Sequence, residues 1–190
     1  MANQEIEIKV KVSNPALLIQ FLQQHATFEG ESHQCDAYFS PAHRDFLAKQ
    51  PIHEWFRLRE DSKGCSLNYK CWHYTKEGKS YNCDEYETPV GDRGAVENIL
   101  KALNFVSLVV VDKNRSTWRF ETYEIALDQV EGLGDFVEVE YKGEDKTDPK
   151  AITDAMVRFL REHGCVSIER NYQGYPFLLL FPDRAQYEMV

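Results

Sequence analysis

The stretch EIEIKVKV, residues 5–12, alternates charged and aliphatic side chains over its whole length. Successive side chains of a β-strand point to opposite faces, so Glu5, Glu7, Lys9 and Lys11 would share one face. A charged face turned to water is typical of any half-exposed antiparallel strand. The alternative is that the charged face points inward, where carboxylates bind metal ions and amines bind phosphates. The rest of the chain has to decide between these two interpretations.

The composition is that of an ordinary globular protein. The 190 residues are 43% hydrophobic and 28% charged, which predicts one domain spanning residues 1–190 with a core of its own. The net charge of −9 argues against a broad basic surface for nucleic acid, although it leaves room for a local basic site.

Neither a membrane span nor a secretory signal is predicted. The longest apolar runs, FVSLVVV and PFLLLF, fall far short of the roughly 20 residues that cross a bilayer. The five cysteines form no CxxC pair, so we expect reduced thiols and a cytoplasmic location.

Helical periodicity predicts three helices, at residues 14–26, 92–105 and 148–164. Most of the remaining chain alternates in the manner of strands. Strands without a regular βαβ repeat favour an α+β fold with a mostly antiparallel sheet. A Glu-x-Glu pattern precedes each predicted helix, at residues 5–7, 85–87 and 138–140.

The other strands carry their own charges at alternate positions. Arg57 lies two residues from Arg59, and Lys113 two residues from Arg115. Each pair alone would suit a solvated face. Because acids and bases are sorted by strand, a closed antiparallel barrel with a charged interior explains the set better.

The charges define the ligand that such an interior would bind. Carboxylate pairs without His or Cys at metal-ligand spacing suit Mg²⁺ or Mn²⁺. Converging Lys and Arg side chains suit a chain of phosphates, and metal ions that bridge the two complete a site for phosphoryl transfer.

The segment EIEIK resembles the ExExK signature of the CYTH, or triphosphate tunnel metalloenzyme, superfamily. QCDAYF, RLR, LNYK, DEYET, DKNR, IALDQVEGLGDFVEVE and ERNY follow in the order of that family, so the resemblance covers nearly the whole chain. It implies a closed antiparallel β-barrel that forms a tunnel, with flanking helices. Members include class IV adenylyl cyclases and thiamine, inorganic and RNA triphosphatases.

The resemblance also implies roles for individual residues. The implied metal ligands are Glu5, Glu7, Glu138 and Glu140, with Asp128 as an adjunct. The implied triphosphate-binding cations are Lys9, Arg57, Arg59, Lys70, Lys113, Arg115 and, on a looser match, Arg170. The implied catalytic set is Glu5, Glu7 and Lys9, with the acidic pair Glu85 and Glu87. Cys83 stands where relatives often have a basic residue, so one phosphate contact is in doubt.

Three functions remain open on the sequence. The favoured one is metal-dependent hydrolysis of a short triphosphate, with tripolyphosphate, thiamine triphosphate and ATP as the candidate substrates. The second is cyclisation of ATP to cyclic AMP and pyrophosphate, for which Tyr38, Phe39, Trp72 or Tyr74 could stack on adenine. The third is a non-catalytic module that binds polyphosphate or a nucleotide. A homodimer is compatible with the sequence, which leaves the oligomeric state open.

Overall fold

The computed structural model of the chain describes residues 3–4, 6–76, 78, 80–144 and 148–190, so Glu5 lies outside the described residues. The helices in this part of the chain are α1 (Ala16–His25), α2 (Arg93–Ala102), α3 (Pro149–Glu162) and α4 (Tyr175–Leu180), with 3₁₀ turns η1 (Phe46–Ala48) and η2 (Pro182–Arg184). The three predicted helices are confirmed. The fourth, α4, arises from the apolar run PFLLLF, which is too short to reveal a helical period.

The remaining elements are strands of one sheet. They are β1 (Asn3–Gln4), β2 (Glu7–Val12), β3 (Thr27–Pro41), β4 (Glu54–Asp61), β5 (Gly64–Tyr74), β6 (Ser80–Val90), β7 (Phe105–Phe120), β8 (Tyr123–Val130), β9 (Gly134–Tyr141), β10 (Ile168–Asn171) and β11 (Tyr187–Met189). The order across the sheet is β1-β6-β5-β4-β3-β7-β8-β9-β2-β10-β11, and every neighbouring pair is antiparallel. The predicted α+β class with an antiparallel sheet is therefore confirmed.

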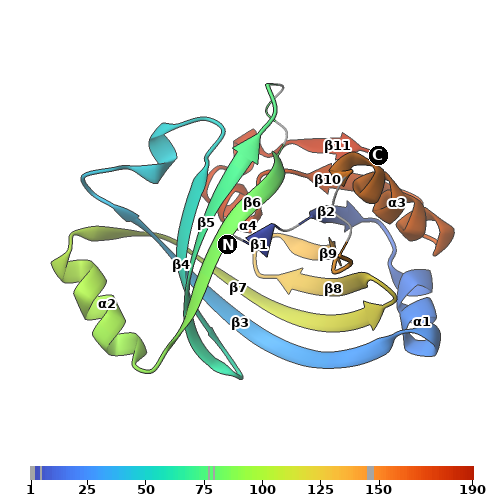
Figure 1. Ribbon diagram of the computed structural model, residues 1–190, viewed down its shortest axis with the longest axis horizontal. Coiled ribbons are helices and arrows are strands. Elements are labelled where there is room, and N and C mark those ends of the chain that lie inside the picture. Colours follow the sequence, from blue (N-terminus) through green and yellow to red (C-terminus); the bar gives the residue numbers. More distant parts are fainter. Residues whose placement is uncertain (1–2, 5, 77, 79, 145–147) are drawn as a thin grey trace.

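The N-terminal segment links two distant parts of this sheet. β1 pairs with β6, whereas β2, which begins three residues after β1 ends, lies between β9 and β10. Three residue steps span at most about 11 Å, so β6 must lie close to β2. The sheet consequently curls round on itself, with β4–β6 crossing over the layer formed by β3 and β7–β9 (Figure 1). In the hydrogen-bonded strand order, β1 and β11 are the two ends. The sheet curls because β1 and β2, which are close in the sequence, pair with strands that are far apart in this order.

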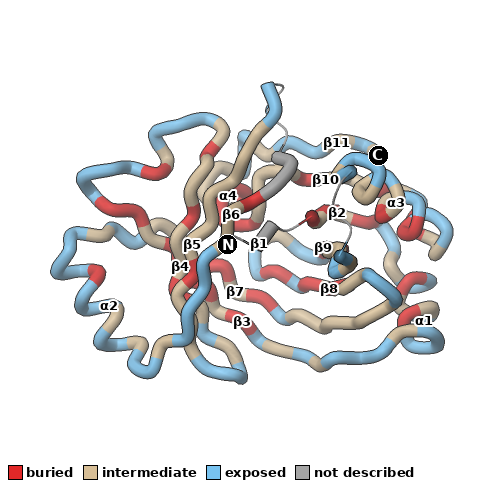
Figure 2. The backbone as a smooth tube through the Cα atoms, in the orientation of Figure 1, coloured by how far each residue is buried: buried red, intermediate tan, exposed pale blue. Residues whose placement is uncertain are grey.

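The outer face of the curled sheet packs against α1 and α3. Ile8 and Val10 of β2 join Leu22 of α1 and Leu160 of α3 in one buried cluster. The aliphatic residues of β2 are therefore directed at the helices, and Glu7 and Lys9 are directed at the inside of the curl. Buried and less buried residues alternate along several strands as this arrangement requires (Figure 2).

A second buried cluster fills one end of the interior. Phe177 and Leu178 of α4 pack against residues from the inner face of the sheet, among them Val111, Val130 and Phe136. Because apolar side chains of α4 fill this end, the polar part of the interior begins at the N-terminal end of α4. Within the described residues, no helix is both long and apolar enough to span a membrane.

Candidate functional site

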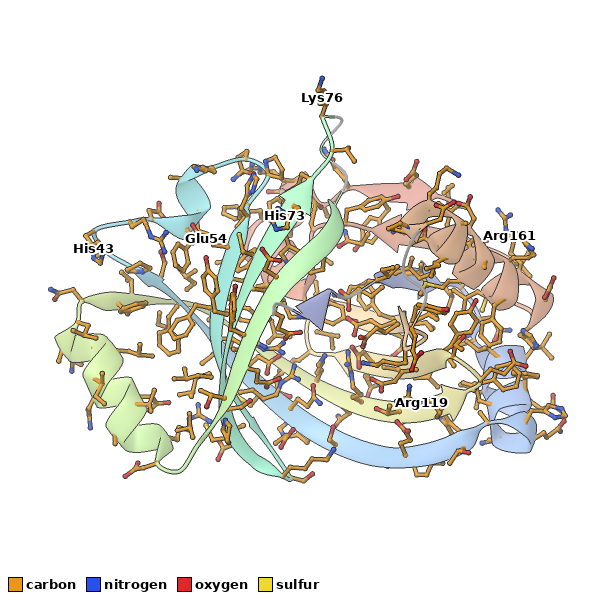
Figure 3. The ribbon with its side chains drawn as sticks, viewed as in Figure 1. His43, Glu54, His73, Lys76, Arg119 and Arg161 are labelled. Atoms are coloured by element: carbon orange, nitrogen blue, oxygen red, sulfur yellow. The ribbon has the colours of Figure 1, made fainter. Side chains whose placement is uncertain are left out.

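A cavity of about 330 Å³ lies inside the curl of the sheet. Side chains from both crossing layers project into this space (Figure 3). The predicted site residues that line it are Glu7, Lys9, Arg57, Arg59, Lys70, Glu85, Glu87, Lys113, Arg115, Glu138, Glu140 and Arg170. Of the predicted site residues, Glu5 lies outside the described residues, and Asp128 is outside the cavity lining. The structure thus brings together residues from seven strands that the sequence separates widely.

Two arginines on β4 are held by one carboxylate on β3. Asp36 accepts hydrogen bonds from Nε of Arg59 at 2.6 Å and from its Nη2 at 2.7 Å, and from Nη1 of Arg57 at 3.2 Å. Burial alone would raise the pKa of Asp36, but the charges and hydrogen bonds of Arg57 and Arg59 lower it to about 2. Asp36 is therefore an ionised anchor that aims both guanidinium groups at the cavity.

Asp128, on β8, plays the same part for two cations of the neighbouring strand β7. Its carboxylate accepts from Nε of Arg115 at 2.6 Å, from Nζ of Lys113 at 3.2 Å and from the Tyr175 hydroxyl at 2.8 Å. Its side chain is fully buried, and four donor atoms from Lys113, Arg115 and Tyr175 already use its oxygens. This position favours a role in holding Lys113 and Arg115, rather than the predicted role as an adjunct metal ligand.

Lys113 is the cation most affected by its surroundings. Its side chain is only 3% exposed. Burial lowers the pKa of its amine to about 8, and the neighbouring Arg115 contributes in the same direction, against the charges of Asp128 and Glu138. An anion placed in the cavity would oppose this shift, so the cation is poised to respond to a bound polyanion.

Glu138 is paired with cations in the ligand-free site. The Nζ of Lys9 lies 2.8 Å from its Oε1, and Arg115 donates a further hydrogen bond to Oε2. Burial would raise the pKa of Glu138, but the charges of Arg115 and Lys9 hold it well below its usual range. This carboxylate is ionised and neutralised from within the protein.

The other acids form a row across three strands. Glu7 on β2 lies opposite Glu140 on β9, and Glu140 lies opposite Glu124 on β8. Burial raises the pKa of Glu140, and the charges of Glu7 and Glu124 add to that, although Lys142 lies 2.6 Å away and opposes them. Glu124 also accepts from Nη2 of Arg119, which lies on β7 below the interior (Figure 3).

This acidic row has the donor chemistry of a hard divalent cation. Carboxylate oxygens are the ligands that Mg²⁺ and Mn²⁺ prefer, and mutual repulsion among carboxylates favours a bound cation. In the described part of the chain, no three His, Cys, Asp or Glu side chains are already close enough to hold one ion. Side-chain rotation of Glu7 and Glu140 would therefore accompany metal binding.

The wall made by β5 and β6 is mixed in charge. Nζ of Lys70 lies 3.3 Å from Oε1 of Glu85, and Asn68 donates to the same oxygen. Glu87 accepts from the Ser66 hydroxyl at 2.7 Å. Cys83 is buried and outside the cavity lining.

Sequence reasoning missed several polar residues of this site, among them Asp36, Asn68, Glu124 and Tyr175. Asp36 lies inside QCDAYF, one of the motifs that carried the family resemblance, and that motif was its only signal. Lys11, the last charge of the opening stretch, donates to the carbonyl of Leu133 and is outside the cavity lining.

Comparison with known proteins identifies a family that matches most of the chain. The model of the CYTH domain family matches residues 3–171. A Methanocaldococcus jannaschii protein named "Putative adenylate cyclase" is 28% identical over 158 residues, which cover 83% of this chain and 87% of the relative.

Two solved structures share the fold over most of their length. A Pyrococcus horikoshii protein superposes with a TM-score of 0.76 at 25% identity and covers 95% of this chain and 99% of its own. A Hippeastrum protein, described as a "putative adenylyl cyclase" with a dominant triphosphatase activity, superposes with a TM-score of 0.63 at 22% identity, covering 94% and 95%.

Proposed function

The chain belongs to the CYTH domain family, and from that membership we propose that it is a divalent-metal-dependent enzyme acting on a triphosphate held inside its curled sheet. One observation carries the proposal. Seven cationic side chains line one cavity of about 330 Å³: Lys9, Arg57, Arg59, Lys70, Lys113, Arg115 and Arg170. A short polyphosphate is the ligand that matches such a density of positive charge, since each phosphate offers several oxygens to guanidinium and ammonium donors.

The anchoring acids support this assignment. Asp36 binds two of the arginines, Arg57 and Arg59. Asp128 binds Lys113 and Arg115, so these four cations are held in place before the ligand binds. Pre-positioned charges of this kind need little rearrangement when negative charge develops during a reaction. Asp36 and Asp128 are therefore positioning residues in this proposal.

A divalent cation would be held by Glu7 and Glu140, with Glu124 beside them and Glu138 as a further carboxylate. The ion, Mg²⁺ or Mn²⁺, would neutralise phosphate oxygens and polarise the phosphorus. Binding it would also relieve the repulsion that contributes to the raised pKa of Glu140. Lys142, now paired with Glu140, would be displaced from that contact.

Hydrolysis is the reaction we favour. A water oxygen forms a bond to the terminal phosphorus, the bond from that phosphorus to the bridging oxygen breaks, and orthophosphate leaves the shortened phosphate chain. Arg57, Arg59 and Arg115 stabilise the charge on the transferred group and on the leaving oxygen. Glu85 and Glu87 are the carboxylates we propose to accept the proton of the water, because they line the cavity on the β6 wall.

Cyclisation of ATP is the second candidate. It is favoured by the adenylate cyclase name of the Methanocaldococcus relative. The triphosphatase activity described for the Hippeastrum protein supports hydrolysis as an alternative for proteins that bear a cyclase name. Both reactions would use the same cations and metal, so the two can be distinguished only by identifying the reaction products.

The deciding experiment incubates the purified protein with tripolyphosphate, thiamine triphosphate or ATP, each with Mg²⁺ or Mn²⁺, and identifies the products. Orthophosphate supports hydrolysis, and cyclic AMP with pyrophosphate supports cyclisation. Binding without any product under all conditions would leave the non-catalytic module.

The free state of all five cysteines is in keeping with the cytoplasmic location that we propose.

A further inference from the structure

Tyr175, the first residue of α4, has two lysine side chains against its ring. The Nζ of Lys9 lies 4.2 Å from the centre of the ring, and the Nζ of Lys113 lies 5.2 Å from it. Both distances are within the roughly 6 Å over which an aromatic ring attracts a cation. Lys9 belongs to β2 and Lys113 to β7, two strands that the sheet order separates by β8 and β9. One side chain of α4 therefore connects cations from two separate parts of the sheet.

The Tyr175 ring is itself held firmly. The residue is buried, and its ring packs edge-on against that of Phe136, with 5.0 Å between the ring centres and an angle of 69° between the planes. Its hydroxyl donates to Oδ2 of Asp128 at 2.8 Å, the same oxygen that accepts from Lys113. Because the packing and the hydrogen bond restrict one and the same side chain, the ring presents a fixed surface to the two lysines.

The backbone before α4 brings Tyr175 to this point. β10 ends at Asn171, whose Oδ1 accepts hydrogen bonds from the backbone N–H groups of Gln173 and Gly174 at 3.0 and 2.9 Å. Gly174 has a φ of 78°, in the left-handed region that favours glycine. Pro176 follows in the first turn of α4, where a helix does not need its missing N–H. The stretch NYQGYP therefore turns the chain from β10 into α4 with Tyr175 at the border of the cavity.

An aromatic ring can hold an ammonium group without neutralising it. A carboxylate that binds a lysine cancels its charge, as Glu138 does with Lys9 at 2.8 Å. The face of a ring attracts a cation through its quadrupole and carries no net charge. Burial raises the pKa of Tyr175 well above its usual value, and the charges of Glu138 and Asp128 add to this, so the side chain stays a neutral phenol. Contact with the ring thus leaves the charge of both lysines available to phosphate oxygens.

The two lysines share their carboxylate partners with other groups. Glu138, the partner of Lys9, is one of the acids that we propose to hold a divalent cation, and binding a cation would weaken this ion pair. Oδ2 of Asp128, the partner of Lys113, also accepts from Arg115 and from Tyr175. The ring contact does not depend on these carboxylates giving up their other ligands.

We propose that Tyr175 is a positioning residue of the phosphate site, whose ring keeps the Nζ atoms of Lys9 and Lys113 at the cavity while their carboxylate partners bind other cations. This inference rests on the proposed function, because it takes the cavity as the triphosphate site. It gives α4 a part in ligand binding, in addition to its packing at one end of the interior.

The test separates the ring of Tyr175 from its hydroxyl and from its bulk. Tyr175→Phe keeps the ring and loses only the hydroxyl, whereas Tyr175→Leu keeps an apolar side chain and loses the ring. Tyr175→Met replaces the second variant if that one fails to fold. Phe177→Leu is the matched control, because it removes a ring from the same helix and the same buried cluster, outside the cavity lining. Calorimetry measures the dissociation constant of tripolyphosphate, first without a divalent cation and then with Ca²⁺, which replaces Mg²⁺ to slow turnover.

A second measurement reports on the ring without any ligand. Protons that lie over the face of an aromatic ring resonate upfield of their usual position. The Hε signals of Lys9 and Lys113 should therefore be shifted upfield in NMR spectra of the wild-type protein and of Tyr175→Phe. Lys113→Arg assigns one of the two signals, because that signal is lost. Both shifts should disappear in Tyr175→Leu.

We expect Tyr175→Leu to weaken tripolyphosphate binding tenfold or more, and Tyr175→Phe to stay within threefold of the wild-type affinity. Phe177→Leu should bind within twofold of wild type, although it lowers the melting temperature. Wild-type affinity of Tyr175→Leu, equal weakening by Tyr175→Leu and Phe177→Leu, or the absence of upfield lysine signals in wild-type protein would each overturn the role of Tyr175. Failure of wild-type protein to bind tripolyphosphate would instead contradict the proposed function, and this role at the phosphate site with it.

Discussion

Asp36 binds the guanidinium of Arg59 through two parallel hydrogen bonds, from Nε at 2.6 Å and from Nη2 at 2.7 Å. This contact fixes both the position and the plane of the guanidinium, because a carboxylate matches its fork at two points. Since Asp36 also binds Arg57, one buried acid controls the geometry of two phosphate-binding side chains.

Replacing Asp36 should therefore destabilise the ligand-free protein. Asp36→Asn leaves two buried guanidinium groups without their counter-charge, and loss of one partner of a buried pair costs about 3–5 kcal/mol. Chemical denaturation of the variant and of wild-type protein at neutral pH measures the difference. The exposed pair of Lys150 and Asp154 offers a control, because exposed ion pairs contribute little and Asp154→Asn should cost far less. Equal losses in the two variants would mean that Asp36 is not an anchor.

The same residue predicts an acid dependence of stability. The pKa of Asp36 falls from its usual 3.8 to about 2 in the folded state. A depressed carboxyl pKa adds stability above the unfolded-state pKa, and that stability is lost as the pH falls through the folded-state value. Between about pH 4 and pH 2, wild-type protein should lose roughly 2 kcal/mol more than Asp36→Asn. Parallel pH curves for the two proteins would contradict this.

Lys113 should make triphosphate binding weaken at alkaline pH. Burial lowers its pKa to about 8 in the ligand-free protein, so above that pH a polyanion must bind together with a proton. The affinity of wild-type protein for tripolyphosphate should fall between pH 8 and pH 10 relative to that of Lys113→Arg, which keeps its charge. In the ligand-free protein, the effect of raising the pH on stability is opposite to its effect on binding. The unfolded chain holds the proton more tightly than the folded one, so the free energy of unfolding should rise over that range. Calorimetry and denaturation measure the two effects.

The acidic row should set the metal requirement. Glu7→Gln and Glu140→Gln each remove one charge from a proposed metal ligand without changing its volume, so turnover should need at least tenfold more Mg²⁺. Glu162→Gln, on the exposed surface of α3, is the control and should behave as wild type. Unchanged activity of both row variants at limiting Mg²⁺ would remove these residues from the metal site.

Arginine geometry should matter as much as charge. Arg57→Ala and Arg115→Ala should each weaken tripolyphosphate binding by about 2–4 kcal/mol, as expected for truncation of a buried charged hydrogen-bonding partner. Arg59→Lys keeps the charge but loses the fork, so it should also weaken binding. Arg44→Ala, which removes an exposed arginine, is the matched control. Normal binding by all three site variants in calorimetry would show that the phosphates lie elsewhere.

Much of this architecture could be predicted from alternation alone. The EIEIKVKV stretch predicts one charged and one aliphatic face, and the structure directs Lys9 at Glu138 and Val10 at the helices. The strand periods and the three longer helices were recoverable for the same reason, because each is a local pattern repeated over several residues.

Pairing between distant strands could not be predicted in this way. Asp36 is a single acid among Cys35 and Ala37, and its role appears only when β3 aligns it with Arg59 of β4. The resemblance implied Asp128 as an adjunct metal ligand, and its hydrogen bonds to Lys113 and Arg115 of β7 became visible only with the strand pairing. Which carboxylates meet cations and which meet one another depends on register, and register is a property of strand pairs.

The N-terminal segment makes folding of this protein a strongly non-local event. β2 finds its partners at residues 137–140 and 168–171, and β1 finds its partner at residues 84–85. On the ribosome, β1 and β2 are made before all of these partners, so β2 must wait until residues 168–171 have been made. Non-local pairing of this kind slows folding, since a long loop has to close before any contact stabilises it. Until then, β6 and β9 are exposed edges open to intermolecular pairing, so the residues that carry the site's first charges also determine how long the nascent chain is prone to aggregate.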